Sequence, residues 1–92
     1  MAINYEADSE LLKALGHPVR LRIAKGLLGR ECSVNKIVNA LGLPQSTVSQ
    51  HLGVLKNSGV ALIRKEGVKI CYRVADKRVI KLIRLLDLKV KK

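Results

Sequence analysis

The sequence predicts one small domain of the α+β class, mainly α-helical, in which four helices are followed by a β-hairpin and a last helix. Three observations support this prediction. The chain has 92 residues, which suits a single domain spanning residues 1–92, with flexible ends expected at residues 1–8 and 89–92. Apolar residues recur at the spacing of amphipathic helices, in segments divided by Gly and Pro. Two short runs rich in β-branched residues flank Gly67, as is typical of a hairpin.

The first two helices are predicted on either side of a Gly-His-Pro break at residues 16–18. Ser9 is the expected N-cap of the first helix, because a serine hydroxyl can accept a hydrogen bond from a free backbone N–H. Pro18 suits the first turn of the second helix, since its fixed φ is helical and its missing N–H is not needed there. Gly29 is expected to end that helix. The apolar positions of the two helices are Leu11, Leu12, Leu15, Val19, Ile23 and Leu27.

The third and fourth helices are predicted on either side of a Gly-Leu-Pro turn at residues 42–44. Ser33 is the expected N-cap of the third helix. The fourth helix is expected to run from Gln45 or Ser46 to Ser58, with Gly59 as its C-cap. The apolar positions are Val34, Ile37, Val38 and Leu41 in the third helix and Val48, Leu52 and Leu55 in the fourth.

The C-terminal part of the chain predicts a hairpin and a last helix. The strands are expected at residues 60–64 and 69–74, and Asp76 is the expected N-cap of the helix that follows. The apolar residues of this helix cover more than one face, so we expect part of it to contact a second subunit. They are Val79, Ile80, Leu82, Ile83, Leu85, Leu86 and Leu88.

This order of elements is that of a helix-turn-helix followed by a two-stranded wing. In such a domain the helix predicted at residues 45–58 enters the major groove of double-stranded DNA, and its first side chains reach the base edges. Glutamine amides can pair with adenine, hydroxyls can bond to bases or phosphates, and the cations of the hairpin can contact phosphates or a minor groove. The candidate DNA-contacting residues are Gln45, Ser46, Thr47, Ser49, Gln50, His51, Arg64, Lys65 and Lys69. Two other roles stay open for His51, packing within the helix-turn-helix and binding a metal.

The charge balance also favours nucleic acid as the partner. The chain carries 18 Lys+Arg against 7 Asp+Glu, a formal net charge of +11, which suits a polyanion; a basic surface that only maintains solubility is the alternative. Tyr5 and Tyr72 are the only aromatic residues of the Phe, Trp and Tyr group, too few for a stacking platform that binds single strands. No apolar run approaches the length of a membrane span, so a cytoplasmic location away from the membrane is expected.

Two other classes of function fit the sequence less well. An enzyme is not expected, because no set of residues has the spacing of a known catalytic motif and no glycine-rich phosphate loop is present. A winged-helix module that docks proteins is the other alternative. Its contact face would need aromatic or large apolar anchors, whereas the fourth helix offers Gln, Ser and Thr.

Three motifs in this order resemble the ArsR/SmtB family of dimeric winged-helix repressors. They are HPVRLRI in the second helix, STVSQHLGVLKNSG in the fourth and GVKICYRV in the hairpin, within a resemblance that covers residues 9–88. The resemblance implies a homodimer joined through the first and last helices and one recognition helix in each half of a palindromic operator. It also implies that an effector releases the repressor from DNA.

The identity of the effector is not set by the sequence, and no cofactor is expected. Family members with zinc between their last helices use Asp, His and Glu there, but no His follows His51 in this chain. Arsenic and cadmium sensors of the family often carry a CxC pair at the start of the third helix, and the corresponding residues here are Ser33 and Asn35. Cys32 and Cys71 are candidate effector thiols for a redox or reactive-sulfur switch, and the alternatives are a purely structural role or a metal site completed by a histidine, His17 or His51.

Overall fold

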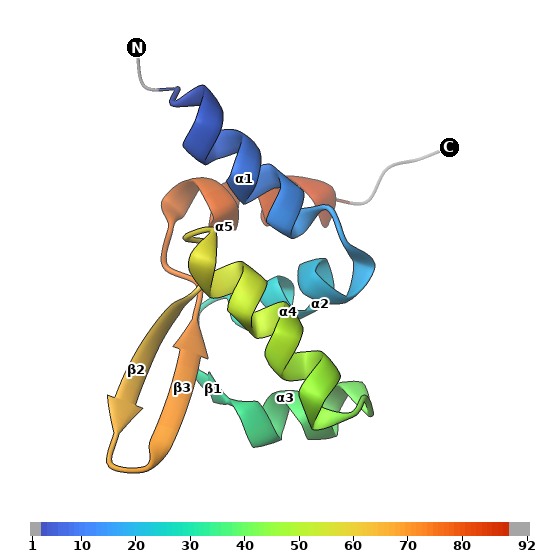
Figure 1. Ribbon diagram of the computed structural model, residues 1–92. Coiled ribbons are helices and arrows are strands. Elements are labelled where there is room, and N and C mark those ends of the chain that lie inside the picture. Colours follow the sequence, from blue (N-terminus) through green and yellow to red (C-terminus); the bar gives the residue numbers. More distant parts are fainter. Residues whose placement is uncertain (1–2, 89–92) are drawn as a thin grey trace.

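Figure 1 shows the computed structural model, which describes residues 3–88 as five helices with a small sheet beside them. The predicted fold class, order of helices and hairpin are confirmed. The elements are α1 (Tyr5–Leu15), α2 (Pro18–Gly26), β1 (Cys32–Ser33), α3 (Val34–Leu41), α4 (Gln45–Asn57), β2 (Leu62–Glu66), β3 (Lys69–Arg73) and α5 (Lys77–Leu86). No helix in this part of the chain is long and apolar enough to span a membrane.

The start of α1 differs from the prediction. Asn4, not Ser9, is the N-cap, and its side-chain oxygen accepts a hydrogen bond of 3.0 Å from the amide of Ala7. Ser9 lies within the helix and donates its hydroxyl to the carbonyl of Glu6. Residues 5–8, which were expected in a flexible end, are therefore helical, and the acidic side chains of the first turn stabilise the helix dipole there. The other expected flexible end, residues 89–92, lies outside the described residues.

The remaining helix ends follow the predicted caps more closely. The side chains of Ser33 and Asp76 cap α3 and α5, and Gly42 ends α3 with a φ of +67°, a conformation that glycine adopts without strain. Two predictions are wrong. α2 ends at Gly26 and not near Gly29, and the C-cap of α4 is Ser58, one residue before the predicted Gly59. The chain leaves α2 early because Leu27 and Leu28 turn toward the end of β3, where Leu28 forms an isolated bridge with Val74.

The wing contains a third strand that the sequence did not predict. β1 pairs with β3, so the antiparallel sheet has the order β1-β3-β2 (Figure 1). A run of two residues carries no alternating pattern, and its pairing partner lies almost forty residues away, which is why sequence reasoning missed it. The hairpin itself closes through Gly67 and Val68. β2 begins at Leu62, later than expected, because the amide of Ala61 donates to the carbonyl of Leu55 near the end of α4 and is not available to β3.

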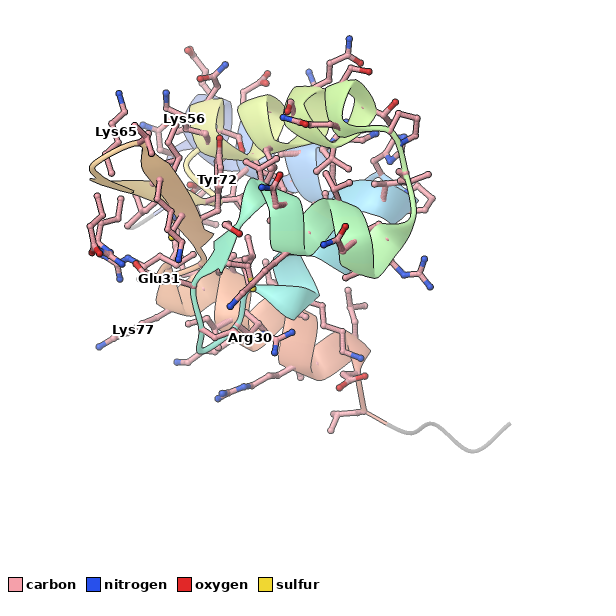
Figure 2. The ribbon with its side chains drawn as sticks, turned by 90° about the horizontal axis from the view of Figure 1, so that it is seen from below. Arg30, Glu31, Lys56, Lys65, Tyr72 and Lys77 are labelled. Carbon is pink, nitrogen blue, oxygen red and sulfur yellow. The ribbon has the colours of Figure 1, made fainter. Side chains whose placement is uncertain are left out.

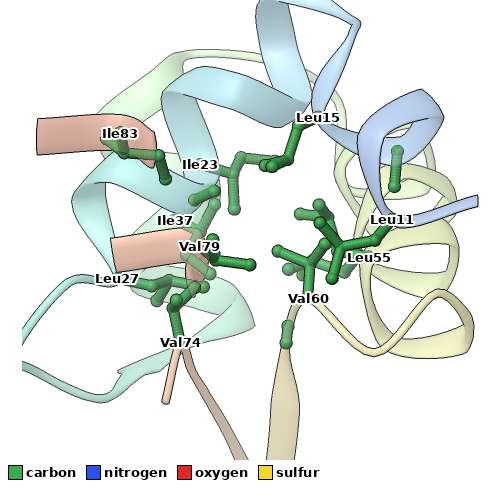
Figure 3. Close-up of a cluster of buried hydrophobic side chains, with 14 of the residues drawn as sticks. Leu11, Leu15, Ile23, Leu27, Ile37, Leu55, Val60, Val74, Val79 and Ile83 are labelled. Atoms are coloured by element: carbon green, nitrogen blue, oxygen red, sulfur yellow. The ribbon is translucent and has the colours of Figure 1, made fainter. Parts of the chain in front are cut away.

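One apolar core joins all five helices to the base of the hairpin (Figure 3). Val48, Leu52 and Leu55 of α4 have no exposed surface at all. Because these three residues form a single stripe, α4 can face the core in only one rotation about its axis. The core thereby decides which side chains of α4 point to solvent.

Candidate nucleic-acid interface

The outward face of α4 carries the polar side chains that were predicted to contact DNA. Gln45, Ser46, Ser49 and Gln50 are exposed on this face. α4 itself lies at the front of the molecule in Figure 1. Thr47 is half-buried at the edge of the polar face. Within residues 3–88, none of these five side chains forms a hydrogen bond with the protein, so their donors and acceptors are available for a ligand.

The wing supplies two exposed cations close to its tip. Lys65 lies on β2 and Lys69 on β3, and the described part of the chain offers no ion-pair partner to either of them. Val68, in the turn between the strands, is fully exposed. The wing tip is therefore a cationic projection that extends away from the core beside α3 (Figure 1).

Arg64 differs from these two lysines because its guanidinium already has partners. It donates to both carboxylate oxygens of Glu31, at 2.8 to 3.1 Å, and it also pairs with Glu66. The hydrogen bonds from Arg64 hold the pKa of Glu31 and of Glu66 below the usual range. Arg64 therefore links the wing to the loop before β1. Of the three cations predicted to contact phosphates, it is the one that already forms ion pairs within the described protein.

His51 lies in a cluster that joins α1, α2 and α4. Its ring is 4.5 Å from that of His17, and its Nδ1 is 3.4 Å from a terminal nitrogen of Arg20. Arg20 also donates through Nε to the carbonyl of Ala14, at 2.6 Å, and through Nη2 to that of Lys13, at 3.3 Å. Burial, then the neighbouring His17 and Arg20, lower the pKa of His51.

This arrangement favours a packing role for His51. Because Arg20 can only donate, Nδ1 of His51 must be the unprotonated nitrogen if the two are hydrogen-bonded. Sequence reasoning did not single out Arg20 as a link between helices. The signal was nevertheless present, since the HPVR and SQHL motifs contain all three members of the cluster. Within residues 3–88, no group of three or more His, Cys, Asp or Glu side chains is placed to hold a metal ion.

The two cysteines lie on neighbouring strands but on opposite faces of the sheet. Cys32 is paired across the strands with Tyr72, and Cys71 is paired with Ser33. Directly paired residues share a face and successive residues alternate, so the two thiols point in opposite directions. This register excludes a disulfide between Cys32 and Cys71 of one chain while β1 and β3 stay paired. Both are free thiols, Cys71 being buried and Cys32 half-buried.

The fold and this face together define a winged helix-turn-helix domain that binds DNA. Comparison with known proteins places it in a family. The model for the arsR family of bacterial regulatory proteins matches residues 17–61. An uncharacterized HTH-type transcriptional regulator of Methanocaldococcus jannaschii is 45% identical over 85 residues, which are 90% of this chain and 94% of that protein. The transcriptional repressor PagR of Bacillus anthracis is 41% identical over 92% of this chain and 86% of its own.

A solved structure has the same fold. HlyU from Vibrio cholerae superposes with a TM-score of 0.84 at 37% identity, and the match covers 94% of both chains. The chain belongs to the ArsR family of transcriptional regulators. The resemblance seen in its three sequence motifs is thereby confirmed, and so is its function as a DNA-binding regulator of transcription.

Proposed function

We propose that this protein is a dimeric repressor that binds a palindromic DNA operator and leaves it when an effector binds. The observation that carries this proposal is the outward face of α4, where Gln, Ser and Thr side chains lie without partners in the described protein. A helix face that only met solvent would be expected to carry Glu and Lys instead. Repression is supported by its relative PagR, which is named as a transcriptional repressor.

In the proposed complex α4 gives specificity and the basic surface gives affinity. The amides of Gln45 and Gln50 suit bidentate bonds to adenine in the major groove. Lys65 and Lys69 contact phosphates or the minor groove beside it, whereas Arg64 keeps the wing in place through Glu31. His51 positions α4 through its contacts with His17 and Arg20, and we assign it no contact with a base.

The proposed dimer uses α1 and α5, as the family resemblance implies. These helices lie side by side, joined by an ion pair of 2.9 Å between Arg78 and Asp8 (Figure 1). Both helices expose large apolar side chains: Leu12 is 56% exposed, Leu85 is 63% exposed and Leu86 is 71% exposed. Apolar side chains of this size seldom remain exposed in such number on a small monomer, and a second copy of the chain would cover them.

The proposal is tested by fluorescence anisotropy with a labelled palindromic fragment from the protein's own promoter and a scrambled fragment as control. If the dimer neutralises about 6 to 10 phosphates, affinity should fall by about 10³ to 10⁵ between 50 and 200 mM salt. A salt slope near zero, or equal affinity for both fragments, would refute sequence-specific binding.

The dimer is tested separately by sedimentation equilibrium. Leu86→Glu places a charge on the proposed dimer surface and should give a folded monomer with weakened operator binding, because one recognition helix then acts alone. Lys77→Glu, at an exposed position in the first turn of the same helix, is the control for adding negative charge. A wild-type protein that is monomeric at operator-binding concentrations would refute the dimer.

A further inference from the structure

A cavity of about 420 Å³ lies between α2 and α3, away from the outward face of α4. The two helices both pack on α4, and the space between them is open to solvent. Ile23, Leu27 and Ile37 form its apolar wall. A cavity of this volume falls within the range of small-molecule sites, at its smaller end.

Small residues explain why the cavity is open. Gly26 on α2 and Ala40 on α3 both line it, and neither has a side chain long enough to fill it. A Cβ atom added to Gly26 would meet no atom within 4 Å. The gap is thus a consequence of side-chain size at this point and not of a strained backbone.

Three cations surround this cavity without an acidic partner. Arg22, Arg30 and Lys36 line it, and within residues 3–88 none of them forms an ion pair. Glu31 also lines it, but its carboxylate is held by the guanidinium of Arg64. The cavity therefore combines an apolar wall with net positive charge at its edge.

Arg30 is held in position for a ligand. Its Nε donates to the carbonyl of Gly26 at 3.1 Å, which fixes the side chain against the end of α2. Its two terminal nitrogens have no partner in the described chain and can donate two parallel hydrogen bonds to a carboxylate. Figure 2 shows Arg30 and Glu31 on the loop that leaves α2.

We propose that this cavity binds a small organic anion with an apolar body, such as a medium-chain or aromatic carboxylate, and that this ligand is the effector. The carboxylate pairs with Arg30 and its neighbouring cations, while the apolar body covers Ile23 and Ile37. The regulatory part rests on the proposed function. It follows from the packing, because a ligand between α2 and α3 pushes on two helices that both support α4, and Leu41 at the cavity directly precedes the turn into α4.

Binding is tested first without DNA, by calorimetry and by amide shifts in NMR spectra, with octanoate and 4-phenylbutyrate as probes. Octanol is the control for charge and acetate the control for the apolar body. Both carboxylate probes should bind and shift the amides of Gly26 and Ala40, whereas octanol and acetate should bind at least about tenfold more weakly. The proposal is overturned if neither probe binds, or if octanol binds as well as octanoate.

Two variants locate the ligand. Gly26→Met fills the cavity at a helical position where the added side chain meets open space, so it should abolish binding and leave the fold intact. Arg30→Gln should weaken octanoate binding about tenfold, while Lys77→Gln, an exposed cation outside the cavity, should leave it unchanged. Octanoate binding that survives in Gly26→Met would overturn the site.

The regulatory part is tested by adding octanoate to the operator complex. We expect operator affinity to fall in the wild type and to stay constant in Gly26→Met. Octanoate bound in the cavity without any change in operator affinity would overturn the effector role. If Arg30→Gln weakens operator binding without octanoate as much as Lys65→Gln does, the cavity cations serve DNA and the proposal is wrong. If the protein binds octanoate in the cavity but does not bind its operator, the proposed function is refuted and the ligand site is not.

Discussion

Removing the Arg20 side chain should destabilise the domain and change the titration of His51. In Arg20→Ala, the carbonyl of Ala14 loses its 2.6 Å hydrogen bond, and the longer bonds to Lys13 and His51 are lost as well. A hydrogen bond from a charged group contributes about 1.5 to 3 kcal/mol, and the two longer ones add little. We therefore expect the free energy of unfolding to fall by roughly 2 to 3 kcal/mol, a large share of the 5 to 15 kcal/mol typical of a domain.

Urea denaturation measures this loss, and the midpoint should shift without a change in the slope m. Thermal denaturation should show a Tm lowered by roughly 10 to 20 °C, since each kcal/mol shifts Tm by about 4 to 8 °C in a domain of this size. Arg20→Lys keeps the charge but cannot make all three bonds, so its stability should lie between those of Arg20→Ala and the wild type. An Arg20→Ala variant within about 0.5 kcal/mol of the wild type would refute this account of the cluster.

The pH dependence provides an independent check. The folded protein lowers the pKa of His51 below its ordinary 6.5, first through burial and then through His17 and Arg20. Between these two pKa values the unfolded chain binds the proton more readily, so stability should fall as pH drops below 6.5 and level off below the folded pKa. In Arg20→Ala the pKa of His51, followed by NMR, should rise and this pH dependence should weaken. An unchanged or lower pKa would contradict the assigned role of Arg20.

Three further predictions concern the recognition helix, the core and the thiols. Gln50→Ala should lower discrimination between correct and incorrect bases by about 1 to 3 kcal/mol at one base pair per half-site, whereas Lys65→Ala should weaken binding to all sequences alike. Fluorescence anisotropy on operator and random DNA separates the two effects. Equal losses of affinity for operator and random DNA in Gln50→Ala would contradict its assignment. Leu52→Ala removes a side chain with no exposed surface and should cost about 2 to 5 kcal/mol in urea denaturation, so a loss under 1 kcal/mol would contradict the packing around α4. Diamide should form no disulfide between Cys32 and Cys71 of the native chain, and mass spectrometry of a digest that found this bridge would disprove the strand register.

Most of the fold was predictable because it is specified locally. The apolar spacing that places Val48, Leu52 and Leu55 on one stripe defines α4 and its polar face without any knowledge of the rest of the chain. Gly42 and Gly67 mark two of its turns, since both adopt a positive φ that other residues avoid. The start of α1 was misplaced because only Ser9 was considered as its cap, whereas Asn4, five residues earlier, caps the helix. Ser and Asn both favour the N-cap position, so residue type alone does not rank them.

The candidate site divides in the same way. The polar side chains from Gln45 to Gln50 were identified from sequence because a single helix face carries them. The partners of Arg64 were not, because Glu31 and Arg64 are 33 residues apart and meet only when β1 and β2 flank β3. A sequence does not distinguish an arginine that is free to contact DNA from one that is ion-paired with a distant glutamate.

The sequence by itself predicted the order of the helices, the hairpin and a polyanionic partner, since helix period, turn chemistry and net charge are properties of neighbouring residues or of composition. Its three motifs, by their resemblance, indicated the family. Only the tertiary structure decided which residues meet. In the folded chain Arg20 and His51 lie in one cluster, and Cys32 and Cys71 lie on opposite faces of the sheet. A cavity lined by cations also lies beside Gly26. Contacts of this kind depend on how elements distant in the chain pack around one core, and no local pattern encodes that arrangement.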